Sequence, residues 1–463
     1  AFESDAAPSR PLFFPVIALS LMTELPKSYT AFDRSVEGAA AFDRTDELRS
    51  YRDRFHIPRK ESGEPVVYLT GNSLGLQPDT AREAVNEVLD DWATFGVGGH
   101  FRAKHAWMPY HEYLTSATAA IVGAKHSEVV VMNSLTVNLH LLMASFYRPE
   151  GKRTKILIEN HAFPSDRYAV RSHIEWHGLN ADDELIIAGK SNNLDILPET
   201  KIESILEEFA DEIALVLIGG VNYYSGQLFD MPRITRAAHA VGAKVGFDLA
   251  HGAGNVELKL HDWDVDFASW CSYKYLNAGP GGPSGVYIHE RHSQSKMGRL
   301  AGWWGHDKSS RFEMPDAFEP ISNAESWQMS NPPILSLAGL RASLMIFSEV
   351  GIASLRAKSL KLTAYLAHLI EHDLSEDIHI ITPSNPSRRG AQLSLRVLPR
   401  STSSPPDSPS RGRRIFEHLE AAGVICDWRE PDIIRLAPVP LYNSFGDAWL
   451  FAEHLKKACT RIV

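Results

Sequence analysis

Short apolar runs alternate with helical segments through the middle of the chain, and this pattern constrains its fold most. Segments such as 78–95, 197–212 and 231–242 have apolar residues at helical spacing. Strands that alternate with helices predict a mainly parallel α/β sheet, and almost continuously apolar strands predict a sheet covered on both faces. The predicted strands are KILIEN (155–160), EIALVLIGGVNYY (212–224), KVGFDLAH (244–251) and DFASWC (266–271), with a further strand, turn and helix from His126.

The length of the chain predicts more than one domain, because 463 residues exceed one ordinary hydrophobic core. We expect a large domain at 68–333, a smaller α+β domain at 334–463, and an N-terminal segment at 22–67 that associates with the smaller domain. Residues 334–370 predict one long helical stretch that leads into the second domain. The Ser-, Pro- and Arg-rich segment 396–414 predicts an exposed loop.

Composition and charge exclude several classes of protein. The net charge is −10 and no basic stripe is present, so we expect no nucleic-acid partner. The 3 cysteines form neither a disulfide framework nor a zinc-type pair, which favours a reducing, cytoplasmic location and no metal. The apolar run 11–21 is too short to span a membrane, and no membrane partner is expected. We expect residues 1–21 to be a disordered or upstream-translated extension, with a signal-peptide core as the alternative.

One lysine stands between a predicted buried strand and a glycine-rich turn. The stretch SYKYLNAGPGGPSG (272–285) places Lys274 directly after the strand DFASWC. Partial burial there would favour a neutral, nucleophilic amine that can form a Schiff base with an aldehyde. The alternative is a lysine at a strand end whose amine extends into water.

An aspartate ends the preceding predicted strand. Asp248 lies 26 residues before Lys274, so the two could lie on neighbouring strands at the same edge of the sheet. A carboxylate there needs a positive partner; it could be the counterion of a protonated pyridine ring, or simply a helix N-cap. An Asp and a Lys at strand ends favour pyridoxal phosphate, and no GxGxxG motif supports a nicotinamide cofactor. We interpret the glycines as close packing beside the cofactor, although a turn without contact would have the same sequence.

Several long motifs then resemble one known family. The motifs are YLTGNSLGLQP, MNSLTVNLHLL, AFPSDRYAV, FDLAHGAGNVELKLHDWDVDFASW, SYKYLNAGPGG, GWWGH and SNPPI, in one order between about Tyr68 and Phe445. They resemble the motifs of the kynureninase family, which belongs to the fold type I pyridoxal-phosphate enzymes in the aminotransferase class V group. The resemblance implies a large domain with a mainly parallel, seven-stranded sheet flanked by helices, a smaller α+β C-terminal domain, and a homodimer.

The resemblance assigns cofactor roles to many positions. Lys274 would bind the cofactor covalently, with Tyr273 at its phosphate and Asp248 at its ring nitrogen; these three are the implied catalytic residues. For individual residues the alternatives are a packed strand aromatic (Tyr273, Phe163), a backbone-bonded histidine (His251) and an ordinary N-cap (Thr136). The residues implied to contact the cofactor are Leu135, Thr136, Phe163, Pro164, Ser165, Asp166, Asp248, His251, Tyr273, Lys274, Trp303 and Asn331.

Two of these positions are implied to come from a second subunit. Trp303 and Asn331 resemble family positions that complete the site across a dimer interface, and Trp304 is the rival for the tryptophan role.

Four residues are implied to bind the substrate. Arg435 would clamp an α-carboxylate bidentately; the alternative is a surface ion pair. Ser73 and His100, the latter in a predicted VGGH loop, would line the pocket for an aryl ketone. His100 with Asn331 resembles family members that prefer 3-hydroxykynurenine, because both can hydrogen-bond a ring hydroxyl.

The implied activity is hydrolytic Cβ–Cγ cleavage of kynurenine or 3-hydroxykynurenine to alanine and anthranilate or 3-hydroxyanthranilate. The alternatives are another fold type I enzyme, such as a cysteine desulfurase or an aminotransferase, or an inactive scaffold of this fold. One departure from the family pattern is Gly219-Gly220, where some members have a hydroxyl residue, so a side-chain contact to the cofactor from this position is in doubt.

Overall fold

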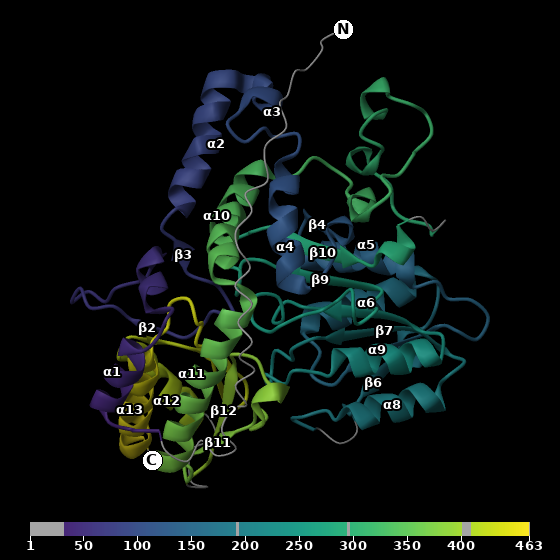
Figure 1. The fold of residues 1–463 in the computed structure, drawn as a ribbon. Coiled ribbons are helices and arrows are strands. Elements are labelled where there is room, and N and C mark those ends of the chain that lie inside the picture. Colours follow the sequence, from purple (N-terminus) through teal and green to yellow (C-terminus); the bar gives the residue numbers. More distant parts are fainter. Residues whose placement is uncertain (1–31, 191–193, 294–296, 401–408, 463) are drawn as a thin grey trace.

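A seven-stranded sheet forms the centre of the larger part of the molecule (Figure 1). The computed structural model describes residues 32–190, 194–293, 297–400 and 409–462, so the predicted extension at 1–21 lies outside the described residues. Neighbouring strands are parallel except where β10 pairs with β4 and β9, which confirms the mainly parallel sheet with one antiparallel strand. In spatial order the strands are β4 (Val129–Met132), β10 (Ser284–Ile288), β9 (Phe267–Cys271), β8 (Lys244–Asp248), β7 (Ile213–Gly219), β5 (Lys155–Glu159) and β6 (Leu185–Ala188).

Each face of this sheet has its own apolar core. Val129 and Val131 of β4 belong to one core, and Val130 and Met132 belong to the other, because successive side chains of a strand point to opposite faces. One core includes residues of α5 (Leu135–Phe146) and α6 (Pro164–Trp176). The opposite core includes residues of α2 (Ala81–Phe95), α4 (Thr115–Val122), α8 (Glu199–Glu208), α9 (Met231–Ala240) and α10 (Ile334–Val350).

A four-stranded antiparallel sheet forms the centre of the smaller part. The core of this part includes residues of the helices α11, α12 and α13 and of the N-terminal helix α1. Helix α1 also contacts α13. A short parallel pair joins β2 (Val67–Tyr68) to β13 (Val424–Ile425), so the first described segment adds a strand to this part. The remaining elements here are β11 (Ile378–Ile380), β12 (Leu393–Val397), β15 (Ile433–Leu436), β14 (Asp427–Arg429), α1 (Val36–Arg44), α11 (Ile352–Asp373), α12 (Arg411–Ala421) and α13 (Phe445–Arg461).

Three local predictions need correction. The single helix predicted at 334–370 is two helices, α10 and α11, because Gly351 has φ of +76° and the axis bends by 82° there. His100 lies in the short helix α3 (Gly99–Arg102) and not in a loop. In the predicted loop 396–414, residues 401–408 lie outside the described part, while β12 continues to Val397 and α12 begins at Arg411.

In the described part of the chain, no single helix is both long and apolar enough to cross a membrane. Only α10 and α11 taken together, as a bent pair, meet the length and composition of a span.

Candidate active site

A cavity of about 370 Å³ opens at the carboxyl ends of the central strands. Parallel α/β sheets bind ligands at this edge, because loops from several strands converge there. Residues from β5, β7 and β8, and from the segment after β9, line the cavity together with Arg435 of the smaller part. The predicted site residues that line it are Ser73, Leu135, Thr136, Phe163, Ser165, Asp166, Asp248, His251, Tyr273, Lys274 and Arg435.

Lys274 is half-buried in this cavity and does not extend into open water. Its Nζ lies 3.1 Å from His251 Nε2 and 6.0 Å from the ring centres of Phe163 and Tyr273. Strand β8 pairs directly with β9, so Asp248 and Lys274 follow neighbouring strands, as their spacing predicted. An amine fixed in this way can attack a carbonyl group within the cavity.

His251 accepts this hydrogen bond as a neutral ring. Burial, and then the charge of Lys274, hold the pKa of His251 well below its usual range. A neutral ring that accepts at Nε2 has its proton on Nδ1, and Nδ1 is buried without a hydrogen-bond partner among the described residues. The alternative of a ring satisfied by the backbone is therefore wrong. A buried N–H without a protein partner is expected in a site where a bound group accepts its hydrogen bond.

Two buried aspartates lie beside each other near Lys274. Asp248 Oδ1 accepts a 2.7 Å hydrogen bond from the N–H of Ala250, but no helix follows it before β9 in the described chain, so it is not a helix N-cap. Burial, and then the charge of Asp248, hold the pKa of Asp166 well above its usual range. Two close carboxylates disfavour each other's ionised form, and this repulsion favours the protonated form of Asp166.

A third acid, Glu159, also lines the cavity and was missed by the sequence analysis. It ends β5, is 4% exposed, and accepts a 3.1 Å hydrogen bond from the N–H of Gly219 through Oε1. Burial raises the pKa of Glu159 to about 7. Its sequence signal was the same as that of Asp248, namely an acid that ends an apolar strand.

The Glu159 carboxyl lies beside Gly219, the position that the sequence analysis noted as a departure from the family pattern. A Cβ at this position would lie 2.9 Å from Glu159 Oε1, so a side chain here would require the Glu159 carboxyl to shift. The Glu159 carboxyl therefore occupies the space that a residue 219 side chain would need.

The first turns of α5 and α6 meet at the cavity and could hold a phosphate. Ser134 is the N-cap of α5 and its side chain does not cap the helix, so Thr136 is not the N-cap. Thr136 Oγ1 lies 2.9 Å from Ser165 Oγ in the first turn of α6. Helix N-termini present free N–H groups and positive dipole ends, which bind anions. Pro164 begins α6 at a position that needs no N–H and does not itself line the cavity.

Arg435 lies on β15 and is 1% exposed, so the alternative of a surface ion pair is wrong. Its Nη1 donates a 2.6 Å hydrogen bond to the carbonyl oxygen of Tyr223, and its Nη2 pairs with Asp427. Tyr223 and Arg429 also line the cavity, although the sequence analysis named neither.

Besides Pro164, three predicted residues do not line the cavity of this chain. His100 packs against Trp107, Trp303 is 40% exposed and donates to the carbonyl oxygen of Arg311, and Asn331 is exposed. Trp304, the rival, is buried. The family resemblance predicts Trp303 and Asn331 to act across a dimer interface, which a single chain does not test.

The glycine-rich turn after Lys274 does not border the cavity. Gly279 and Gly281 have φ of +87° and +69°, a backbone conformation that favours glycine. Gly279 and Gly282 line a second hollow, of about 860 Å³, together with residues of α2 and α10. None of these glycines lines the cavity, which favours the alternative of a turn without contact, and positive φ explains Gly279 and Gly281.

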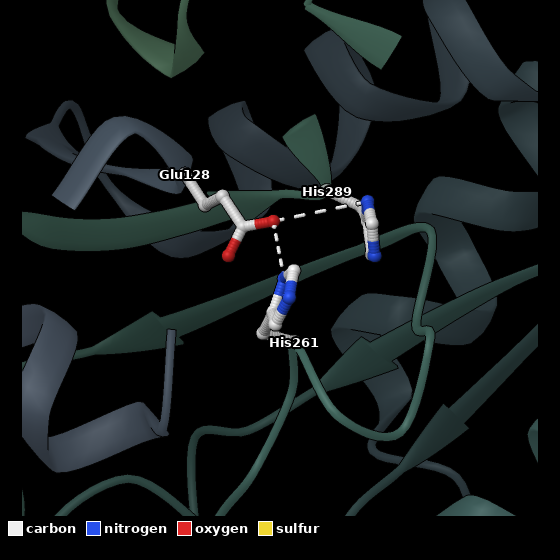
Figure 2. A group of neighbouring side chains, drawn as sticks. All are labelled: Glu128, His261 and His289. Carbon is white, nitrogen blue, oxygen red and sulfur yellow. Dashed lines mark hydrogen bonds and ion pairs between the residues drawn. The ribbon is translucent and has the colours of Figure 1, made fainter. Parts of the chain in front are cut away.

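A separate cluster has metal-ligand side chains but uses them internally (Figure 2). Glu128 Oε1 lies 2.9 Å from His261 Nδ1 and 3.7 Å from His289 Nδ1. The same oxygen accepts from the N–H of Glu290, and His289 Nδ1 accepts from the N–H of Arg291. These bonds connect the segment before β4 to the end of β10. They satisfy the buried Glu128 carboxylate without a metal ion.

Comparisons with known proteins agree with this geometry. The family model "Aminotransferase class-V" matches residues 67–400, and "Kynureninase C-terminal domain" matches residues 355–455. The kynureninase of Koribacter versatilis is 51% identical over 91% of this chain and 97% of its own length. That of Myxococcus xanthus is 51% identical over 92% of this chain and 97% of its own length.

Solved structures show the same fold at low identity. A complex of the cystine C-S lyase C-DES with cysteine persulfide has a TM-score of 0.70, is 18% identical, and aligns over 84% of this chain and 97% of its own. The apo cysteine desulfurase of Thermococcus onnurineus has a TM-score of 0.68, is 18% identical, and aligns over 86% and 95%. These likenesses concern the fold alone, whereas the identity to kynureninases extends over almost the whole chain. The chain therefore belongs to the kynureninase family, with the α/β fold of the class V aminotransferases.

Proposed function

We propose that this enzyme hydrolyses the Cβ–Cγ bond of L-kynurenine or 3-hydroxy-L-kynurenine. The products are L-alanine and anthranilate or 3-hydroxyanthranilate. One observation carries the proposal: the Lys274 amine lies 3.1 Å from a neutral histidine, in a cavity that also holds the Asp166–Asp248 pair. Relatives named kynureninase, about half identical over nine-tenths of the chain, support the choice of reaction.

The cofactor is pyridoxal phosphate, and the residues present fit it. Lys274 supplies the amine for its aldehyde, and His251 contacts that amine through Nε2 while its buried Nδ1 has no partner among the described residues. The first turns of α5 and α6, with the hydroxyl of Tyr273, would hold the phosphate, and Phe163 would stack on the ring. When bound, the cofactor supplies an electron sink for the electrons left at the α-carbon.

Lys274 is the base for the α-proton in this proposal. A base must be neutral when it accepts the proton, and a neutral His251 can hold the amine in place by accepting a hydrogen bond from it. The carboxylate of Asp248 would face the protonated ring nitrogen of the cofactor, with Asp166 beside it. A water molecule then adds to the γ-carbonyl before the Cβ–Cγ bond breaks.

The substrate residues and the dimer belong to the same proposal. Arg435 would bind the α-carboxylate and Ser73 would line the pocket, while His100, Asn331 and Trp303 would come from a second subunit. The segment around His100 supports a covered surface, because Trp92, Val97 and Phe101 are 60%, 83% and 72% exposed. A homodimer would bury such side chains.

The three cysteines bear on both the reaction and the location. Cys271, Cys426 and Cys459 are free and buried, so none has the position of a loop nucleophile in a desulfurase. Free cysteines also favour the cytoplasm, where we place the enzyme in tryptophan catabolism and NAD biosynthesis.

Product analysis with both substrates tests the proposal. We expect L-alanine and the matching anthranilate in equal amounts, whereas a transaminase would consume a keto acid and release no anthranilate. His100→Ala should lower kcat/KM for 3-hydroxykynurenine about tenfold more than for kynurenine, because it removes one hydrogen bond to the ring hydroxyl. Equal losses for both substrates would contradict the assigned role of His100.

A further inference from the structure

Two arginines that line the cavity, Arg429 and Arg435, form a charge cluster with Asp427. Asp427 Oδ2 lies 3.2 Å from Arg429 Nη2 and also pairs with Nη2 of Arg435. Asp427 and Arg435 are register partners on the adjacent strands β14 and β15. Their side chains are 10% and 2% exposed, whereas that of Arg429 is 40% exposed.

Asp427 competes with a substrate carboxylate for Arg435. A guanidinium can bind a carboxylate bidentately through Nη1 and Nη2, or through Nε and Nη2. Both arrangements use Nη2, the nitrogen that Asp427 already contacts. The neighbouring Nη1 donates to the carbonyl oxygen of Tyr223, and only Nε is buried without a partner among the described residues. Arg435 with Asp427 alone is therefore a neutral pair, which offers little attraction to a second carboxylate.

Arg429 changes this balance of charge. With both arginines and one aspartate, the cluster carries one net positive charge, which matches one incoming carboxylate. Arg429 contacts the same Asp427 oxygen and lines the same cavity as Arg435. It can hold Asp427 when Arg435 turns to the substrate.

The structure also has room for Asp427 to move. An adjacent hollow of about 350 Å³ is lined by Asp427 and by Ser73, which also lines the main cavity. A carboxylate displaced from Arg435 could remain beside Arg429 within this space.

We propose that Asp427 pairs with Arg435 in the place of the substrate α-carboxylate when no substrate is bound. Arg429 is the second cation of the substrate site, and it retains Asp427 when the substrate carboxylate pairs with Arg435. This inference rests on the proposed role of Arg435 in the proposed function. It adds a positioning residue, Asp427, and a specificity residue, Arg429, to that site.

A double-mutant cycle on the holoenzyme tests the inference, with L-alanine as the probe and cofactor absorbance as the readout. Arg429→Gln leaves a neutral cluster and should raise the Kd for L-alanine about tenfold, the effect of one charge-assisted hydrogen bond. Asp427→Asn in the same chain restores one net positive charge, so the double variant should bind within about threefold of the wild type. L-Alaninamide, which lacks the carboxylate, should bind the Arg429→Gln variant as it binds the wild type.

Controls separate this inference from a structural effect and from the proposed reaction. Arg233→Gln removes a cation that pairs with Glu203 on α8 and lines neither hollow, and it should leave L-alanine binding unchanged. An unchanged Kd in Arg429→Gln, an equal loss for the amide, or no recovery in the double variant would overturn the inference. Failure of the wild type to cleave kynurenine would refute the proposed function, while the alanine cycle would still decide the role of Arg429.

Discussion

At the scale of single residues, the unusual feature of the cavity is a third buried acid. Glu159 is 4% exposed and accepts a hydrogen bond from the N–H of Gly219. Burial raises its pKa from an ordinary 4.5 to about 7, and the nearby charge of Asp248 acts in the same direction. The native protein therefore holds Glu159 protonated at a pH where the unfolded chain ionises it.

This difference predicts a pH-dependent effect of Glu159→Gln in the cofactor-free protein. A raised native pKa costs no stability well below pH 4.5; the cost grows as the pH rises from 4.5 to about 7 and is constant above that. Glutamine stays neutral, so the variant should match the wild type near pH 4 and exceed its free energy of unfolding near pH 8. This shift in the pKa of Glu159 corresponds to about 3 kcal/mol of unfolding free energy. Urea unfolding of the variant and the wild type at the two pH values measures the difference.

Glu208→Gln provides the matched control, because Glu208 is an exposed residue near the end of α8. It should change the free energy of unfolding equally, and little, at both pH values. A difference between Glu159→Gln and the wild type that does not depend on pH would contradict a protonated Glu159.

The sequence predicted most of the residues that line the cavity, but not the side chains with which they form hydrogen bonds and ion pairs. Lys274 and Asp248 could be found because each follows an apolar strand, and Glu159 has the same signal but matched no motif that was compared. The ion pair between Arg435 and Asp427 depends on the register of β14 and β15. Register between strands is set by packing and turns, which residue spacing does not reveal.

At the scale of elements, the strands were predictable and the breaks between elements were not. Buried parallel strands are almost continuously apolar, so β5, β7 and β8 stood out from the sequence. Gly351 was missed because apolar residues continue on both sides of it, and only its positive φ separates α10 from α11. The antiparallel direction of β10 follows from the turn at Gly279 and Gly281, whose conformation the composition alone did not specify.

At the scale of the whole molecule, the proposal places each site between two subunits. Figure 1 shows α2 and α3 projecting at one end of the molecule, away from the four-stranded sheet. His100 in α3 has exposed apolar neighbours and does not line the cavity of its own chain. Trp303 and Asn331 do not line that cavity either.

Subunit complementation tests this arrangement. Lys274→Ala chains, which are inactive alone, and Asn331→Ala chains, which should lose most activity on 3-hydroxykynurenine, should form mixed dimers in which one site has both native residues. Random mixing should recover about a quarter of wild-type activity, since half of the dimers are mixed and each has one intact site.

A second pairing gives the control for complementation. Lys274 and Asp248 line the same cavity of one chain, so Lys274→Ala mixed with Asp248→Ala should recover no activity. Recovery in this control, or none with Asn331→Ala, would contradict a site shared between subunits.

The central claim is that Lys274 binds the cofactor and transfers the α-proton, and Lys274→Ala tests it most directly. The measurement is the visible absorbance of the bound cofactor together with L-alanine formation from kynurenine. We predict that the variant loses the absorbance of the lysine-bound cofactor and that turnover falls at least about a thousandfold, while Lys361→Ala, at an exposed position, keeps both. Wild-type absorbance and turnover in the Lys274→Ala variant would contradict the account.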